Sequence, residues 1–226
     1  MIAAAGDEML NLPLAMGTGK IVWDMIYDQP SVSRIDPAGV SRFDKRGYNV
    51  NIRTVQKGDI KACHRIEQAC FESGEAASLK SIQERAAVYP DGFIVAEIDH
   101  SVVGMVNSGS TDSDDITDEA FKKLIGHTEN GKNIVVFSVS VLPEFQGKGI
   151  ASALMKQFIK RAGQLKKVNV LLLCKTDLIP FYKRLGFEYG GISDSTHGGS
   201  KWHEMVFRLS PMPDQWAGSD KIQNRS

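Results

Sequence analysis

Apolar and polar positions follow a regular pattern from about residue 48 to residue 209, and the first 46 residues lack it. Apolar residues spaced three or four positions apart predict helices, and short β-branched or apolar runs bounded by turn residues predict strands. The predicted strands cover residues 48–54, 93–98, 102–106, 134–142, 168–173, 187–190 and 202–209. The predicted helices cover residues 59–71, 78–89, 117–125, 150–165 and 178–185, and residues 108–116 are predicted to form a polar surface loop.

This order of elements predicts an α/β (α+β) domain. Its sheet is mixed and mainly antiparallel, with a parallel strand pair in the middle and helices on its flanks. The predicted domain spans residues 47–210, between an N-terminal extension (1–46) and a C-terminal tail (211–226). Prolines interrupt the extension, which shows no chemistry and is predicted to have a structural role or to be loosely packed.

A turn of small residues lies within the stretch from Val139 to Ser152, with glycines at Gly147 and Gly149. It connects a predicted strand to a predicted helix. Exposed backbone N–H groups and the helix dipole favour an anionic phosphate there, and small residues let the backbone approach it closely. The same pattern is also typical of an ordinary strand-to-helix turn. A second segment, LIPFYKRLGF at residues 178–187, favours the phosphate-binding interpretation.

Together the two segments resemble the GNAT superfamily of acyl-CoA N-acyltransferases, and the resemblance covers residues 48–209. The segments CKTDLIPFY (174–182) and WHEM (202–205) are most similar to the arylalkylamine (serotonin) N-acetyltransferase branch. The resemblance implies that the central parallel strands splay apart and that acetyl-CoA enters the gap. Its pantetheine arm would pair with the first strand. The implied coenzyme-binding residues are Val139, Ser140, Val141, Gln146, Gly147, Lys148, Gly149, Ile150, Ala151 and Ser152.

Acetylation of an amine needs a base for the ammonium proton and an acid for the departing thiolate. The resemblance assigns the acid to Tyr182. It does not supply the base, because Val135 and Phe137 stand where the arylalkylamine branch has two histidines. The sequence leaves open the candidate bases Glu72, His203 and Glu204, as well as an acetyl-enzyme route through Cys174.

The acceptor predicted from this resemblance is a small primary amine, either an arylalkylamine or a polyamine. The residues predicted to meet it are Phe71, Glu72, Leu173 and Trp202, with Glu75 and Leu79 close by. A carboxylate beside an aromatic ring suits a cationic amine on an apolar body. A peptide or protein acceptor, and a non-catalytic acyl-CoA-binding module, remain as alternatives.

Composition and charge narrow the classes of protein to which the chain can belong. The chain has 27 basic and 27 acidic residues, a balance that argues against a nucleic-acid-binding protein. No apolar run reaches the roughly 18 residues of a membrane span, and the N-terminus lacks a basic signal region, so a cytoplasmic location is expected. Three cysteines without CxxC spacing predict neither a disulfide framework nor a metal site. Dimerisation of many relatives makes a homodimer an expectation, although no interface pattern is visible.

Overall fold

The computed structural model describes residues 41–43, 49–72, 74–117, 119–195 and 197–209. Apart from the short strand β1 (Ser41–Phe43), the predicted N-terminal extension and C-terminal tail lie outside this part of the chain. The domain boundaries therefore stay predictions.

The described elements follow the predicted order. The strands are β1, β2 (Asn49–Thr54), β3 (Phe93–Ile98), β4 (Ser101–Thr111), β5 (Asn133–Val141), β6 (Asn169–Lys175), β7 (Glu188–Ile192) and β8 (Trp202–Arg208). The α-helices are α2 (Ile60–Cys70), α3 (Leu79–Val88), α4 (Ile150–Gln164) and α5 (Ile179–Arg184).

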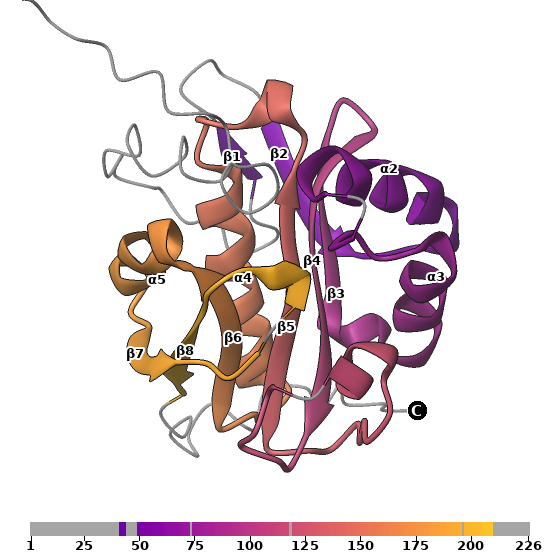
Figure 1. Cartoon of the computed structure of the whole chain (residues 1–226). Coiled ribbons are helices and arrows are strands. Elements are labelled where there is room, and N and C mark those ends of the chain that lie inside the picture. Colours follow the sequence, from indigo (N-terminus) through magenta and orange to yellow (C-terminus); the bar gives the residue numbers. More distant parts are fainter. Residues whose placement is uncertain (1–40, 44–48, 73, 118, 196, 210–226) are drawn as a thin grey trace, which may run out of the picture.

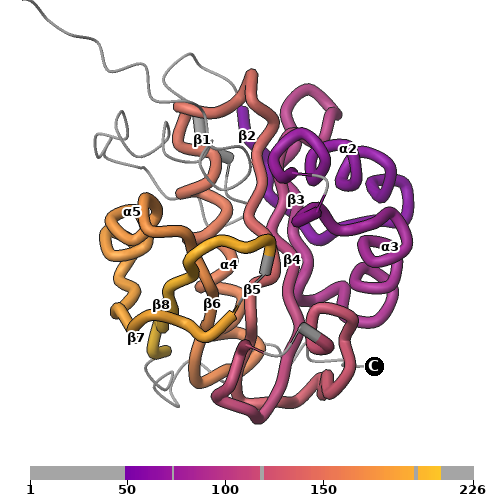
Figure 2. Tube along the Cα trace, in the orientation of Figure 1, coloured from indigo at the N-terminus to yellow at the C-terminus, as the bar shows by residue number. Residues whose placement is uncertain are grey.

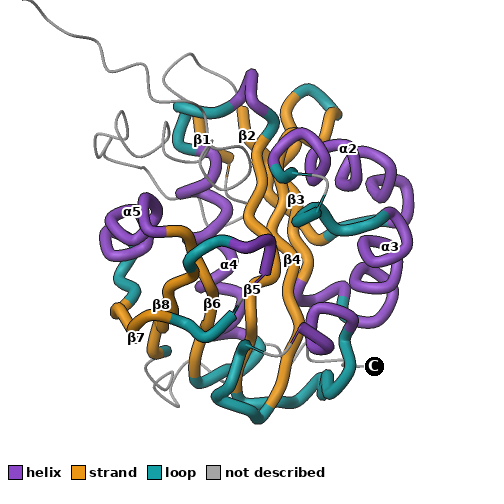
Figure 3. Tube along the Cα trace, in the orientation of Figure 1, coloured by secondary structure: helices purple, strands orange, loops and turns teal. Residues whose placement is uncertain are grey.

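The described strands form one eight-stranded sheet in the order β1-β2-β3-β4-β5-β6-β8-β7. Its neighbouring strands are antiparallel except for β5 and β6, which run parallel. In Figure 1, α2 and α3 lie together on the right and α4 lies behind the strands. Figure 3 shows the strands passing between these helices. The mixed, mainly antiparallel sheet with a central parallel pair is confirmed.

The parallel pair separates part of the way along its length. Four residue pairs join the strands, from Asn133–Asn169 to Val136–Leu172. Beyond them β5 continues to Val141 and β6 continues to Lys175 with no further pairing between the two. Figure 2 lets the two strands be followed as they diverge. The predicted splay is therefore present, and it leaves one edge of Phe137–Val141 open.

Apolar side chains fill both faces of the sheet, as the alternation along each strand requires. The larger core packs α4 and α5 against the sheet and includes Leu154, Phe158 and Phe181. A second core lies under α2 and α3. A third, smaller cluster, built around Phe121, Val135 and Leu171, covers the β5–β6 region. The splayed part of β5 also contacts α2, because Cys70 Sγ lies 3.1 Å from the Val141 carbonyl.

Two local predictions were wrong. Residues 108–111 continue strand β4 instead of opening a surface loop. They are small and polar, but Ser108 Oγ donates to the Gly92 carbonyl at 2.7 Å and Ser110 Oγ donates to the Gly131 carbonyl at 3.2 Å. Satisfied hydroxyls can be buried in a central strand. The predicted helix at 117–125 is a 3₁₀ turn, Glu119–Lys123.

Candidate functional site

A pocket of about 490 Å³ opens beside the splayed strands. The α2–α3 connection and α3 form one wall, the 3₁₀ turn at 119–123 forms another, and β5, β6 and the start of β8 form the floor. Four aromatic side chains line it, namely Phe71, Phe121, Phe137 and Trp202. The predicted acceptor residues Phe71, Leu173 and Trp202 are among the lining residues.

The pocket wall also contains two buried charges, Glu67 (3% exposed) from α2 and Arg85 (6% exposed) from α3. A row of buried polar side chains connects them. Arg85 Nη1 donates to Asn107 Oδ1 at 2.9 Å, and Asn107 Nδ2 donates to Ser138 Oγ at 2.6 Å. Ser138 in turn lies close enough to the Glu67 carboxylate to oppose the rise in pKa that burial causes in that group. We call Arg85, Asn107, Ser138 and Glu67 the polar row.

Glu67 is held from several directions. The Ala77 N–H donates to its Oε1 at 3.2 Å, and Ser140 Oγ donates to its Oε2 at 3.4 Å. Burial raises the pKa of this carboxyl group, while these donors and Arg85 act in the opposite direction. A carboxyl group in a pocket whose pKa is raised is suited to accept a proton.

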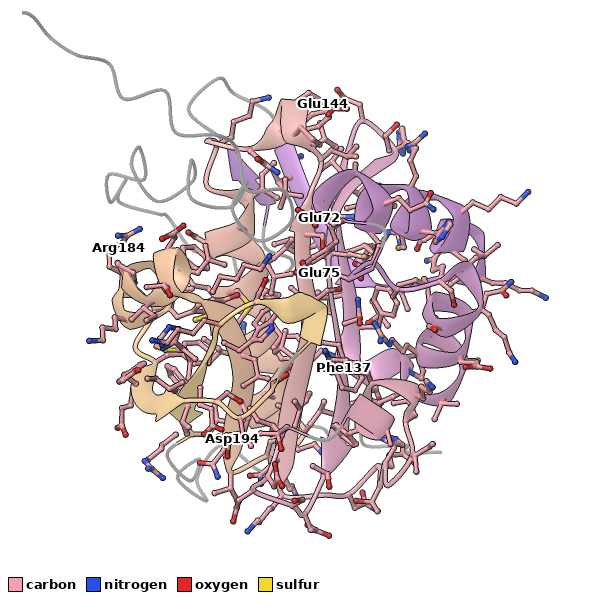
Figure 4. The ribbon with its side chains drawn as sticks, in the orientation of Figure 1. Glu72, Glu75, Phe137, Glu144, Arg184 and Asp194 are labelled. Atoms are coloured by element: carbon pink, nitrogen blue, oxygen red, sulfur yellow. The ribbon has the colours of Figure 1, made fainter. Side chains whose placement is uncertain are left out.

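A second acidic side chain closes one side of the pocket. Lys175 Nζ donates to both carboxylate oxygens of Glu75, at 2.9 and 3.2 Å, and Ser200 Oγ donates to one of them at 3.4 Å. Glu75 comes from the α2–α3 connection, Lys175 ends β6 and Ser200 precedes β8. Figure 4 shows Glu75 between the two halves of the molecule, above Phe137. We call this set of contacts the Glu75 bridge.

The predicted phosphate-binding turn has the expected backbone. Gly147 and Gly149 adopt φ values of +73° and +80°, which favour glycine. A Cβ on Gly147 would meet nothing within 4 Å among the described atoms. Gly149 is the N-cap of α4, and no described side chain caps the helix there. The first N–H groups of a helix lack intrahelical acceptors, and at the start of α4 the residues Ile150, Ala151 and Ser152 are buried.

Two side chains shape the entry to this turn. Gln146 Nε2 donates to the Val141 carbonyl at 2.8 Å, which fixes the turn to the end of β5. Lys148 Nζ donates to the Glu144 carbonyl at 2.7 Å. The predicted pantetheine residues Val139, Ser140 and Val141 lie on the segment of β5 that β6 leaves unpaired. Their coenzyme contacts stay predictions.

Tyr182, the predicted acid, is buried on α5 beside Cys174 and packs against the rings of Phe181 and Phe187, at centroid distances of 5.0 and 5.5 Å. Burial raises the pKa of its hydroxyl well above the usual range, so the group keeps the proton that an acid must donate. Cys174 is fully buried, and burial raises the pKa of its thiol to about 12. A thiol held in this form is a poor nucleophile, which argues against the acetyl-enzyme route.

The other candidate bases are placed less favourably. Glu72 is exposed and does not line the pocket. His203 is buried between Thr176 Oγ1, 2.9 Å from Nε2, and the Tyr189 hydroxyl, 3.0 Å from Nδ1. Glu204 lies on the same face of β8 as Trp202 but packs against the Gly190 backbone of β7.

Sequence reasoning missed Glu67. Its signal was the spacing, because Glu67 follows Cys63 by four positions and precedes Cys70 by three, on the buried stripe of α2. Within the described residues, no group of three or more His, Cys, Asp or Glu side chains is arranged to hold a metal ion. Over the same residues, no helix is both long and apolar enough to cross a membrane.

Curated relatives match between about a quarter and 70% of this chain. The chain is 29% identical over 141 residues to GCN5-related N-acetyltransferase 2, chloroplastic, of Arabidopsis thaliana, covering 54% of this chain and 55% of that protein. It is 28% identical over 176 residues to histone acetyltransferase TAP1 of Glycine max, covering 70% and 71%. The chain therefore spans only about half the length of the Arabidopsis relative.

Solved structures of similar fold include the loading GNATL domain of CurA from Lyngbya majuscula, with a TM-score of 0.63, 16% identity, and coverage of 70% of this chain and 97% of that one. Another is yncA of Salmonella typhimurium, a putative acetyltransferase solved with its cofactor acetyl-CoA, with a TM-score of 0.55, 20% identity, and coverage of 72% and 95%. At these identities the likeness concerns the fold alone.

The model of the acetyltransferase (GNAT) family matches residues 60–187, from the start of α2 to the residue before β7. The match includes the splayed strands, the glycine turn and Tyr182, and it covers more than half of the chain. This protein belongs to the acetyltransferase (GNAT) family.

Proposed function

We propose that this protein is an N-acetyltransferase that moves the acetyl group of acetyl-CoA directly to the primary amine of a small molecule. The observation that carries the proposal is the continuity of the site. The open edge of β5 runs from the glycine turn to a pocket that contains a buried carboxylate. A donor lying along this edge would present its thioester to an amine in the pocket.

The residues present fit an acyl-CoA donor. The free edge of Phe137–Val141 offers backbone groups to an extended pantetheine arm, which would act as an added strand. The positive φ values of Gly147 and Gly149 fit a turn that lets a pyrophosphate approach the first N–H groups of α4. That yncA, a neighbour of the same fold, was solved with acetyl-CoA supports this assignment.

Two side chains handle the protons of the reaction. Glu67 accepts a proton from the acceptor ammonium, directly or through one water, and so frees the nitrogen lone pair. The nitrogen attacks the thioester carbonyl, the carbon–sulfur bond breaks, and Tyr182 donates its proton to the departing sulfur. Burial raises the pKa of both groups, which makes the Glu67 carboxylate a stronger base and keeps the Tyr182 hydroxyl protonated.

The shape of the pocket favours a small acceptor. The Glu75 bridge joins the α2–α3 connection to the ends of β6 and of the β7–β8 loop, so an extended peptide would have to displace it. The aromatic lining favours an acceptor with an apolar or aromatic body over a polyamine. A protein acceptor is the second candidate, because one relative is named a histone acetyltransferase. The predicted homodimer and cytoplasmic location stay predictions, and one relative is named chloroplastic.

The proposal is tested by thiol release from acetyl-CoA with arylalkylamines, polyamines, amino acids and peptides. Tyr182→Phe should lower kcat by about 10²-fold or more, as expected for loss of a general acid, with little change in acetyl-CoA affinity. Tyr189→Phe is the matched control, because it removes a hydroxyl that contacts His203 outside the pocket lining. Tight acetyl-CoA binding without thiol release from any acceptor would favour the binding-module alternative.

A further inference from the structure

Arg85 is a buried cation whose hydrogen bonds all go to neutral groups. Nη1 donates to Asn107 Oδ1 at 2.9 Å, and Nη2 and Nε donate to the Lys122 carbonyl at 2.9 and 3.3 Å. No carboxylate among the described residues lies within ion-pairing distance of its guanidinium. A guanidinium carries five N–H donors, so these three bonds leave two of them available.

Arg53 shows how this fold treats a guanidinium that needs a counter-ion. It pairs with Asp59 at 2.7 Å and with Glu97 at 2.6 Å, although it is more exposed than Arg85. A buried charge without a paired opposite charge is costly to maintain. Burial lowers the pKa of the Arg85 guanidinium, and the carboxylate that opposes this shift is Glu67, which acts from beyond ion-pairing distance. The pocket that both residues line is where a closer anion would enter.

The guanidinium is also held in a fixed orientation. Its central carbon lies 4.7 Å from the centre of the Phe137 ring. Its hydrogen bonds to Asn107 and to the Lys122 carbonyl fix the positions of Nη1 and Nη2. A planar, preoriented guanidinium matches the two oxygens of a carboxylate. Because Arg85 lines the same pocket as Glu67, an anion bound to it would lie close to the proposed site of amine deprotonation.

We propose that the acceptor is zwitterionic, with a carboxylate that binds Arg85 and an ammonium that faces Glu67. This inference rests on the proposed function and narrows its acceptor to an amino acid. Arg85 and Glu67 line the same pocket, so one molecule bound there would face both charges. The rings of Phe71, Phe121 and Trp202 would surround a large apolar or aromatic side chain.

Three acceptors with the same ring test the inference, namely L-phenylalanine, its methyl ester and 2-phenylethylamine. Only the first has a carboxylate. The amine of the ester is less basic, and that of phenylethylamine more basic, than the amine of the amino acid, so basicity cannot explain a preference over both. We expect kcat/KM for phenylalanine to exceed both others by at least about tenfold, the equivalent of one good ionic contact. A dipeptide with a distant carboxylate should resemble the ester.

A substitution of Arg85 tests whether this residue causes the preference for an acceptor with a carboxylate. Arg85→Gln should bring the ratio of kcat/KM for phenylalanine over its ester close to one. Arg65→Gln, which removes an exposed arginine from α2, should keep the wild-type ratio. If Arg85→Gln fails to fold, as judged by circular dichroism, the comparison of acceptors with the unaltered protein still decides.

The outcomes distinguish failure of the zwitterionic acceptor from failure of the proposed N-acetyltransferase activity. Equal or better turnover of the ester and phenylethylamine would overturn the zwitterionic acceptor and leave the N-acetyltransferase proposal standing. Absence of thiol release with every amine, despite acetyl-CoA binding, would overturn the proposed function and this inference with it.

Discussion

Glu67 stands where packing alone would place an apolar residue. It lies on the stripe of α2 that includes Cys63, Ile66 and Cys70, and it is as buried as they are. Burial raises the pKa of its carboxyl group above the value expected in the unfolded chain. The charged form is then disfavoured by folding, and stability falls as pH rises from the unfolded pKa to the folded one. A residue kept at such a cost is usually kept for function.

Glu67→Gln should separate activity from stability. We expect kcat to fall by about 10²–10⁴-fold, the usual contribution of a general base. The free energy of unfolding at pH 8 should equal or exceed that of the wild type, because glutamine does not ionise. The difference should shrink as pH falls below the unfolded pKa. Thermal unfolding across pH and steady-state kinetics check the two parts.

Loss of stability without loss of turnover in Glu67→Gln would contradict the proposed role of this residue. If Glu67→Gln unfolded at clearly lower temperature near pH 8 while retaining turnover, Glu67 would be a structural partner of Arg85 and Ser138. The proton acceptor would then have to be sought elsewhere.

Residues with local motifs could be predicted from the sequence, and residues defined by tertiary neighbours could not. Gly147 and Gly149 lie on the predicted turn with the backbone that the turn requires, and Trp202 lines the pocket. Glu72 was chosen because it follows an aromatic residue, yet the end of α2 leaves it exposed. Arg85 has no local signal, since its role depends on Asn107 from β4 and on the 3₁₀ turn after it.

The loop before β8 is matched to the Glu75 bridge. A Cβ on Gly198 would come within 2.6 Å of the Glu75 carboxylate, whereas a Cβ on Gly199 would meet no described atom within 4 Å. Both glycines have similar positive φ values, +59° and +65°. An alanine at either position therefore carries a similar backbone cost of about 1–2 kcal/mol. Only the first disturbs Glu75.

This pair of glycines gives a controlled test of the bridge. Gly198→Ala should lower acceptor kcat/KM about tenfold relative to Gly199→Ala, which corresponds to about 1.4 kcal/mol. Acetyl-CoA affinity should be the same in the two variants, because neither substituted glycine belongs to the turn at Gly147 and Gly149. Identical acceptor kinetics in both would show that the bridge does not shape the pocket.

A second pair tests the glycine turn itself. Gly149→Val should abolish measurable acetyl-CoA binding by calorimetry, since a β-branched side chain fits neither the positive φ nor a close phosphate. Gly126→Val is the control, because Gly126 has a φ of +82° and open space around it but lies after the 3₁₀ turn at 119–123. Loss of binding in both variants would point to backbone strain alone.

Elements were predicted well where periodicity was strong, as in α2, α4 and β6, whose ends lie within two residues of expectation. Strand β4 was cut short because Ser108 and Ser110 look like loop residues. Their partners, the carbonyls of Gly92 and Gly131, belong to other segments of the chain. Periodicity cannot register hydrogen bonds of this kind.

Over the whole molecule, the sheet consists of two parts joined by four residue pairs. The part from β1 to β5 carries α2, α3 and α4, and the part from β6 to β8 carries α5. A donor bound along β5 should protect the amides of Phe137–Val141 and of the first turn of α4 from hydrogen exchange. The amides that join β2 and β3 should be unaffected. Mass spectrometry after exchange, with and without acetyl-CoA, measures this, and protection confined to other segments would contradict the placement of the donor.

The open edge of β5 also has a consequence for the protein when it is empty. Unpaired strand edges invite pairing with other chains, and most proteins keep such edges at the margin, where charges, prolines or bulges guard them. Here the edge lies inside the sheet and its residues, Phe137–Val141, are mostly apolar. A ligand bound in the gap would therefore also block pairing of this edge with another chain. The supply of that ligand would then affect how readily copies of this protein aggregate.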